Sequence, residues 1–365
     1  MVAVWNDETG RGWAPYGLAA RVAAAEARMQ AELDTAVADL AIADGWRLDD
    51  RTRRDIDTTI GGLVETIGSA VRRHAGRLLA DRDIDGAAVL RPVAEVMPRL
   101  AAAGLLRDRA LVAILVACVR HDRIAAALPI VVVDDETPGL LIRLAGAADP
   151  AVAAAALALL RLDGRRREAW DRGEPGPVDL PTPLHERVAW QVAAALRGQD
   201  ASAAVNRAVD RALATATARL LADHDEAACP DAVALRLAAA IDPQPQDCTA
   251  LLVAAIDDCR LDLFGALIAH RLDIAMPDMR TIVVDPVGDR LWLALRALAL
   301  DRTALARIAL ALADADPRRD IDGFASQLDM IAAIPAGEAA AVLAPLSLPA
   351  ALHVAIRAIE QRPRW

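Results

Sequence analysis

The arrangement of apolar and polar positions predicts two long amphipathic helices near the start of the chain. In the first, apolar side chains recur in steps of three and four from Leu18 to Leu40, which is the spacing of one helix face. The second begins after Asp49 or Asp50, either of which is a suitable N-cap. It repeats the same spacing at Ile56, Ile60, Leu63, Ile67, Ala70 or Val71, His74 and Leu78. The two helices are expected to form a hairpin, which packs on later helices or on a second copy of itself in a homodimeric four-helix bundle.

Beyond Asp81 the apolar pattern changes to short helices. They are expected near Ala87–Ala103, Arg107–Val119, Arg123–Leu128, Pro138–Ala147 and Pro150–Leu160. Asp149 before Pro150 is a favourable helix start, because aspartate caps the helix and proline fits its first turn. Short helices that follow one another in pairs are typical of HEAT-type helical repeats.

The segment Leu162–Pro183 loses the apolar periodicity and is rich in Arg, Gly and Pro, which predicts a linker between two domains. The chain is then divided into a tail (1–13), a first helical domain (14–161), the linker (162–183) and a second helical domain (184–365). In the second domain we expect helices near Leu184–Leu196, Ala201–Ala222, Asp231–Ala240, Cys248–Ile256 and Leu261–Ala269, followed by two more that are capped by Asp285 and Asp301. The strand-like runs Ile130–Val133 and Thr281–Val284 are too short to build a sheet, so the predicted fold class is all-α.

Composition narrows the possible functions. All 41 basic residues of this 365-residue chain are arginine, which excludes mechanisms that need a lysine, such as a Schiff base or a phosphate-binding loop. The net charge of −10 argues against nucleic acid and membrane surfaces as partners. No apolar run approaches the roughly 20 residues of a membrane span, and the N-terminus lacks a signal-peptide pattern, so a cytoplasmic protein is expected.

No complete cofactor or metal motif is found in the sequence. The four cysteines lack the spacing of a zinc site and are interpreted as buried free thiols. Asp223–Glu226 and Cys229 contain metal-ligand residue types, but a polar loop between helices is expected there anyway. The pair His121–Asp122 is of the type that binds metal in HD-type phosphohydrolases, yet no spacing connects it with the other histidines, His185, His224 and His270. We therefore predict no cofactor and no metal.

Two further segments contain residues of the types that signalling proteins use. Pro129–Glu136 resembles the first strand and acidic pair of a receiver domain, but such a domain also needs a lysine, so a buried turn is the better interpretation. His74 lies among arginines on a long helix, which is the setting of a phosphotransfer histidine. Its place on the apolar stripe favours a packed histidine instead, and phosphotransfer remains the alternative.

Three arginines and two tryptophans are candidates for binding a partner. Arg165, Arg166 and Arg167 form the densest basic cluster, which is either a solvated charge run or a docking site for an acidic or phosphorylated partner. Trp46 and Trp170 lie in predicted connecting segments where helix packing does not require them, and exposed tryptophan beside arginine is typical of interaction hot spots.

The segment from Leu48 to Leu128 resembles the DUF2336 family of bacterial helical proteins. The resemblance lies in a helix that opens with Leu48-Asp49-Asp50-Arg51, an apolar register, and the basic segment Val71–His74 that continues to Asp81. It implies HEAT-like helices and the role of a helical adaptor or signalling accessory. It transfers no catalytic residue.

Together these features predict a cytoplasmic, non-enzymatic helical scaffold or adaptor that binds one or more proteins. The alternative is a histidine phosphotransfer protein that uses His74. A small-molecule sensor that binds between the two predicted domains also stays open.

Overall fold

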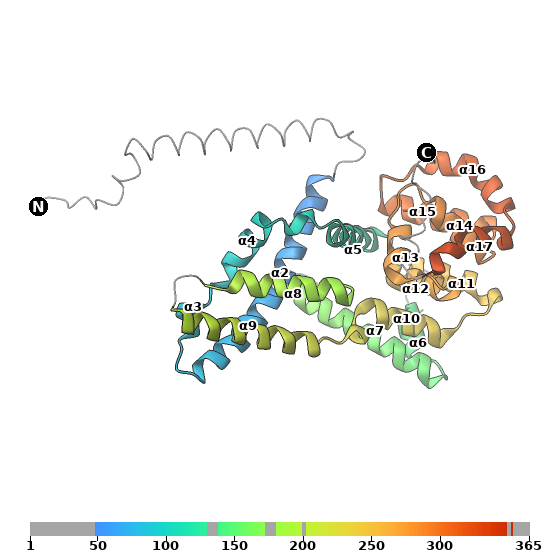
Figure 1. Cartoon of the computed structure of the whole chain (residues 1–365). Coiled ribbons are helices and arrows are strands. Elements are labelled where there is room, and N and C mark those ends of the chain that lie inside the picture. Colours follow the sequence, from blue (N-terminus) through green and yellow to red (C-terminus); the bar gives the residue numbers. More distant parts are fainter. Residues whose placement is uncertain (1–47, 130–137, 172–179, 199–201, 349–351, 353–365) are drawn as a thin grey trace, which may run out of the picture. The chain divides into compact units, whose positions relative to one another are not determined.

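A computed structural model describes residues 48–129, 138–171, 180–198, 202–348 and 352 (Figure 1). Within these residues it contains 16 α-helices, labelled α2 to α17, and no strand, so the predicted all-α fold class is confirmed. By its internal contacts the chain divides into two units, Met1–Arg53 and Arg54–Trp365. The first predicted helix, Leu18–Leu40, lies outside the described residues, and the hairpin and the homodimer stay predictions.

Helix α2 (Asp50–Ala80) is the second long helix that the sequence predicts. Asp49 is its N-cap, because its carboxylate accepts the backbone N–H of Thr52 at 2.8 Å. The buried face of the helix consists of Thr52, Ile56, Ile60, Val64, Ile67, Gly68, Val71, Ala75 and Leu79. His74, which the sequence places on the apolar stripe, is half-buried, as Leu63 and Leu78 of the same stripe are. Small residues occupy the buried face where other helices come close: a Cβ on Gly68 would lie 2.9 Å from Val93 Cγ1.

The helices after α2 differ from the prediction at their breaks. Two short helices, α3 (Gly86–Val89) and α4 (Val96–Ala102), replace the single helix predicted over Ala87–Ala103. Pro92 explains the break, because it lacks an amide donor and disfavours helical backbone in the preceding residue. Conversely, α5 (Arg109–Ala127) is one helix where two were predicted, and Asp108 caps it by accepting the amides of Ala110 and Leu111.

The predicted linker is helical over half its length. Helix α6 (Leu140–Ala145) is followed by α7 (Pro150–Asp171), which Asp149 caps as predicted by accepting the amide of Ala151 at 2.7 Å. Helix α7 continues through Leu162–Asp171, and α8 (Thr182–Leu196) begins before Pro183. Leu162 is buried and anchors this part of α7 to the core, although the residues after it are mostly charged.

The remaining helices are α9 (Ala203–Ala222), α10 (Pro230–Ile241), α11 (Pro245–Asp257), α12 (Leu261–Leu272), α13 (Met276–Val283), α14 (Asp289–Ala297), α15 (Arg302–Ala315), α16 (Ile321–Ala333) and α17 (Ala336–Leu343). Of these, α9 to α12 follow the prediction closely, whereas α13 was not predicted and includes most of the strand-like run Thr281–Val284. The predicted cap Asp301 is confirmed, since it accepts the amide of Ala304 at 2.8 Å. Asp285 is not a cap: Gly288, with a left-handed backbone, precedes α14 instead.

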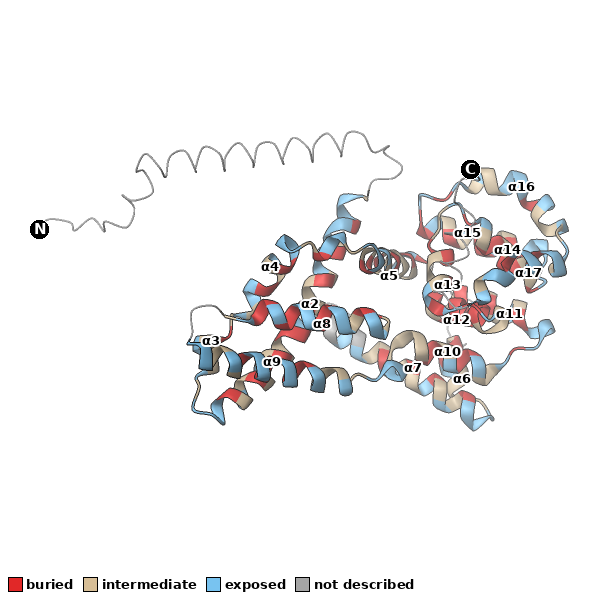
Figure 2. Cartoon of the chain, in the orientation of Figure 1, coloured by how far each residue is buried: buried red, intermediate tan, exposed pale blue. Residues whose placement is uncertain are grey.

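Many of the buried hydrophobic residues form one large cluster, here called the α12 core. Helix α12 is buried from Leu263 to Ala269 (Figure 2), and the end of α5, helices α6 and α7, and helices α10 to α17 contribute to the same cluster. Because Leu159 of the predicted first domain and Leu267 of the second belong to it, the boundary predicted at 162–183 does not separate two cores.

A second set of helices, the α2/α8 group, consists of α2, α3, α4, α8 and α9. The amide of Arg91 donates to the carbonyl of Leu196 at 2.9 Å, and Leu90 and Arg197 form an isolated antiparallel bridge, so the segment after α3 joins the end of α8. Helix α4 packs against α8, and α8 against α9. Segments from both sides of the predicted linker thus share this group.

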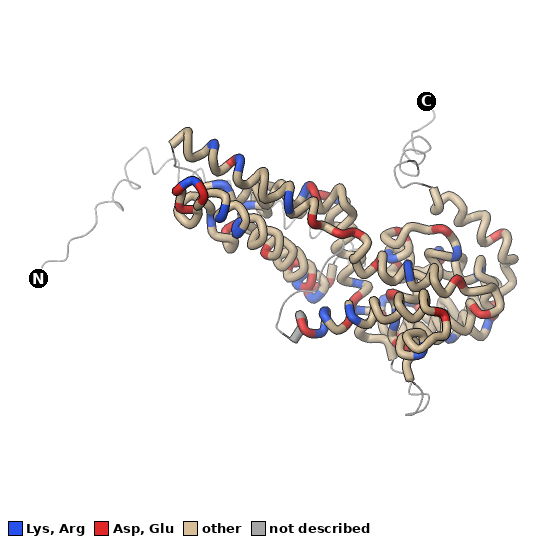
Figure 3. The backbone as a smooth tube through the Cα atoms, turned by 90° about the horizontal axis from the view of Figure 1, so that it is seen from below, with Lys and Arg blue, Asp and Glu red and all other residues tan. Residues whose placement is uncertain are grey.

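The packing of α5 also differs from a helical solenoid, in which a repeat contacts only its neighbours. Helix α5 contacts α12, α13 and α15, which follow far later in the sequence. The HEAT-like arrangement is therefore not confirmed. Acidic and basic residues are interspersed along the helices (Figure 3).

Within the described residues, no single helix has both the length and the apolar composition of a membrane span. One bent pair, Ile321–Ala333 with Ala336–Ser347, meets both criteria when its two helices are taken together across an angle of 106°.

Candidate functional site

The basic cluster predicted as a docking site lies on a helix and not in a linker. Arg165 and Arg167 are exposed on the last part of α7. The side chains of Arg166 and Trp170, and the whole of Trp46, lie outside what the structure describes. A different tryptophan, Trp190 on α8, is 40% exposed and was not singled out by the sequence.

His74 on α2 is held by its own helix. The guanidinium of Arg77 lies 3.1 Å from Nδ1 of His74, measured from Nη2. Arginine can only donate, so Nδ1 is the acceptor and a neutral ring carries its proton on Nε2. A phosphoryl acceptor needs a free lone pair, and this hydrogen bond leaves the neutral ring none. The geometry thus weighs against phosphotransfer through His74, which stays a prediction.

A surface pocket of about 430 Å³, here called the α6–α11 pocket, lies between three helices of the described part of the chain. Its walls are formed by α6, the end of α10, helix α11 and the turn between α10 and α11. Apolar side chains dominate the lining and charged groups are interspersed among them. The lining residues are Leu140, Arg143, Ile241, Asp242, Pro243, Gln244, Asp247, Ala250, Leu251 and Ala254.

Hydrogen bonds fix the walls of this pocket. The carboxylate of Asp258, just after α11, accepts the backbone N–H of Leu140 and so holds the start of α6. Gly139 makes room for this contact, since a Cβ there would lie 3.2 Å from Asp258 Oδ2. At the opposite wall, Nε2 of His270 lies 3.3 Å from Asp242 Oδ1. Asp242 has the left-handed backbone that ends α10 and turns the chain into α11.

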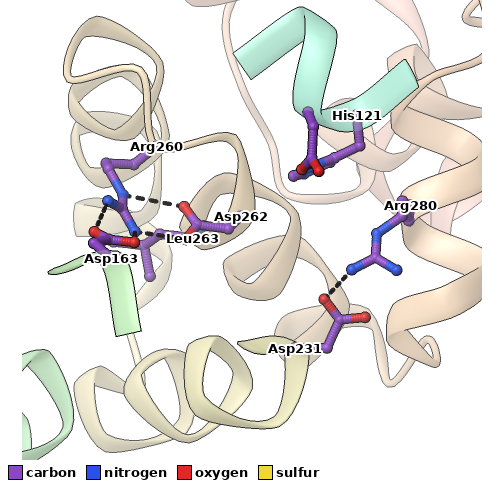
Figure 4. A network of polar contacts seen from close by, with 8 residues as sticks. His121, Asp163, Asp231, Arg260, Asp262, Leu263 and Arg280 are labelled. Atoms are coloured by element: carbon purple, nitrogen blue, oxygen red, sulfur yellow. Dashed lines mark hydrogen bonds and ion pairs between the residues drawn. The ribbon is translucent and has the colours of Figure 1, made fainter. Parts of the chain in front are cut away.

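Arginine–aspartate contacts surround the α12 core (Figure 4). Arg260, which precedes α12, donates to Asp163 of α7 and to Asp262 at 2.5 Å. Burial opposes the charge of Arg260, but the two carboxylates outweigh it and raise the pKa of the guanidinium above its ordinary value. Arg260 therefore joins the predicted linker, through Asp163, to the centre of the core.

A second arginine, Arg280 on α13, connects three helices. It donates to Asp231 on α10 and, at 3.2 Å, to the sulfur of Cys118 on α5. Among the four free cysteines, only Cys248 is buried, so the prediction of four buried thiols is wrong for Cys118, Cys229 and Cys259. Burial raises the pKa of Cys248 and of Cys259.

The structure brings two histidines together that no sequence spacing connects. The rings of His185 on α8 and His224 after α9 are in contact, with centroids 4.1 Å apart and planes tilted by 39°. His121 and His270 do not join them: Nδ1 of His121 lies 3.5 Å from Asp122, and His270 contacts Asp242. In the residues that the structure describes, no group of three or more His, Cys, Asp or Glu side chains is arranged to hold a metal ion.

Comparison with known proteins leaves the chain without a family. No family model matches it, and neither a curated protein nor a solved structure does. The resemblance to DUF2336 thus stays an expectation from the sequence.

Proposed function

We propose that this protein is a non-enzymatic helical adaptor, and that it binds a protein partner through the α6–α11 pocket. The observation that supports the proposal is the pocket itself, an apolar hollow whose walls are fixed by Asp258 and His270. Leu251 and Ala254 of α11 and Ile241 of α10 contribute to its apolar lining. A preformed apolar hollow with a polar rim suits the anchor side chain of a partner.

The charges near the pocket define the chemistry of that partner. Asp242 and Asp247 line it against a single arginine, Arg143, so the rim is acidic on balance. The net charge of the whole chain has the same sign. We infer that the partner presents a large apolar side chain flanked by basic residues, as electrostatic complementarity requires. The resemblance to DUF2336 would make it a signalling protein.

The experiment blocks the pocket with a charge while leaving the core intact. Ala250 lies on α11, lines the pocket and is exposed, so Ala250→Arg fills the hollow without disturbing packing beneath it. Ala325 is an exposed alanine on α16, away from the lining residues, and Ala325→Arg is the matched control. Both variants and the wild type would be used to capture proteins from the host lysate, with mass spectrometry as the readout.

We expect at least one protein that the wild type and Ala325→Arg retain and that Ala250→Arg loses. Its contact with the pocket is checked by a photo-crosslinking amino acid in place of Gln244, which lines the pocket and is exposed. Identical sets of proteins from the two variants would contradict binding at this pocket. Turnover of a nucleotide or phosphoester by the purified protein would contradict the non-enzymatic part, if a single substitution abolished it.

A further inference from the structure

The contact between His185 and His224 joins two parts of the fold. His185 lies in the first turn of α8, which belongs to the α2/α8 group, and His224 lies in the connection from α9 to α10, where the α12 core resumes. Beside them, the hydroxyl of Thr182 lies 2.5 Å from Oε2 of Glu226, so the same two segments also meet through a hydrogen bond. The pair therefore occupies the point at which the chain passes from one group of helices to the other.

Each ring has a buried nitrogen without a hydrogen-bond partner. These atoms are Nδ1 of His185 and Nε2 of His224. A neutral imidazole can leave an unprotonated nitrogen there, but a protonated imidazole carries N–H groups on both nitrogens. Protonation would thus bury a charged N–H that lacks an acceptor. It would also place two positive charges on rings whose centroids are 4.1 Å apart.

In the described part of the chain, no carboxylate forms a hydrogen bond or an ion pair with either ring. On α8, Glu186 is exposed and Arg187 pairs with Asp108. The other charged residues of the surrounding segments also have their own contacts: Asp223 pairs with Arg219, Asp225 caps the short helix Glu226–Ala228, Glu226 binds Thr182, Asp231 at the start of α10 binds Arg280, and Glu95 beside α4 pairs with Arg91, while Arg99 on α4 is itself cationic. Burial, followed by the imidazole of His224, lowers the pKa of His185.

We propose that the His185–His224 pair is a pH-sensitive latch, which holds the start of α8 against the α9–α10 connection while both rings are neutral and opens when they are protonated. The stability of the closed latch depends on pH because proton binding differs between the closed and the opened state. In the unfolded or opened segment His185 binds a proton with the ordinary histidine affinity, near pH 6.5, and in the closed latch its pKa is lower. The latch is closed above that pH and weakens as the pH falls below it.

The test measures local opening by hydrogen exchange of the full-length protein at pH 7.5 and pH 5, with the intrinsic pH dependence of exchange removed. We expect the amides of the first turn of α8 and of residues 224–229 to lose protection at pH 5, by roughly tenfold for each unit by which the pKa of His185 is lowered. The amides of α12 serve as the internal reference and should change less.

Three variants distinguish local opening at the histidine pair from a loss of stability of the whole protein at low pH. His185→Phe and His224→Phe keep an aromatic ring but cannot be protonated, so each should remove most of this pH dependence. His270→Gln is the control, because His270 contacts the carboxylate of Asp242 and lies outside the pair. A pH dependence that is unchanged in both phenylalanine variants would overturn the proposal, as would a loss of protection spread evenly over α12.

If the phenylalanine variants do not fold, a measurement on the wild type tests the latch. The ring protons of His185 and His224 can be titrated by NMR, with assignments from single His→Gln variants of the other histidines. We expect at least His185 to titrate below pH 6.5. An ordinary or raised pKa of His185 would refute the latch.

Discussion

At the scale of single residues, arginine has a structural role that lysine could not fill. Arg260 binds two carboxylates at once, and Arg280 binds a carboxylate and a thiol on different helices. A guanidinium presents several donors in a fixed planar arrangement, whereas an ammonium is a single compact charge. A chain whose cations are all arginine can therefore use them to join helices around a core that has few aromatic side chains.

Replacing Arg260 by lysine should show this directly. Arg260→Lys keeps the charge but cannot reach Asp163 and Asp262 with the same geometry, so we expect a loss of about 1–3 kcal/mol in the free energy of unfolding. Urea denaturation at neutral pH measures it. Arg302 is the matched control: it pairs with Asp329 at 2.6 Å with both side chains exposed, and Arg302→Lys should change stability by less than about 0.5 kcal/mol. Equal losses in the two variants would show that the Arg260 contacts are not special.

At the scale of elements, the clearest difference between sequence and structure is α7. Its last part, Leu162–Asp171, contains few apolar residues and one glycine, Gly164, and so has the composition of a linker. A single buried leucine and the Asp163–Arg260 contact are enough to continue the helix. Apolar periodicity detects helices by a repeated buried face, and it misses a segment that tertiary contacts hold at one or two points.

Gly164→Ala tests whether this segment is helical. A Cβ on Gly164 would meet nothing within 4 Å, and alanine is favoured over glycine inside a helix, so we expect a gain of about 0.5–1 kcal/mol in unfolding free energy. Gly104 provides the contrast, because its φ of +88° is costly for alanine, and Gly104→Ala should lose about 1–2 kcal/mol. Thermal and urea unfolding would measure the gain in unfolding free energy for Gly164→Ala and the loss for Gly104→Ala. A loss for Gly164→Ala would contradict a helical Leu162–Asp171.

What the sequence could predict follows from the same reasoning. Helices α9 to α12 and the caps Asp49, Asp149 and Asp301 repeat local rules of spacing and hydrogen bonding, and these were predicted nearly as observed. The α6–α11 pocket and the His185–His224 pair were not, because each joins residues that are distant in the sequence. Local sequence patterns do not predict contacts between such distant segments.

The cap of α5 should contribute to stability in two separable ways. Asp108 accepts two amides of α5 and also binds Arg187 of α8, and these hydrogen bonds outweigh burial and lower the pKa of its carboxyl. Asp108→Ser keeps a capping oxygen and should cost less than about 1 kcal/mol, while Asp108→Ala should cost about 1–2 kcal/mol. Arg187→Ala isolates the ion pair. A loss for Arg187→Ala as large as that for Asp108→Ala, measured by urea denaturation, would mean that capping contributes nothing.

At the scale of the whole molecule, helices of the two predicted domains pack together and do not form two separate cores. The α12 core takes residues from both sides of the predicted boundary, and so does the α2/α8 group. Folding one predicted half alone would leave the apolar faces that contact the other half without cover. The chain from Arg54 onward is accordingly one compact unit by its contacts.

This organisation predicts one cooperative unfolding transition where two independent domains would give two. Leu159, in the predicted first domain, and Leu267, in the second, are both fully buried in the α12 core. We expect Leu159→Ala and Leu267→Ala each to lower the midpoint of the same transition, at a cost of about 2–5 kcal/mol. Circular dichroism in urea and calorimetry would follow the transition in both variants. If Leu159→Ala moved an early transition and left a later one in place, while Leu267→Ala did the reverse, the two halves would be independent and the shared core would be refuted.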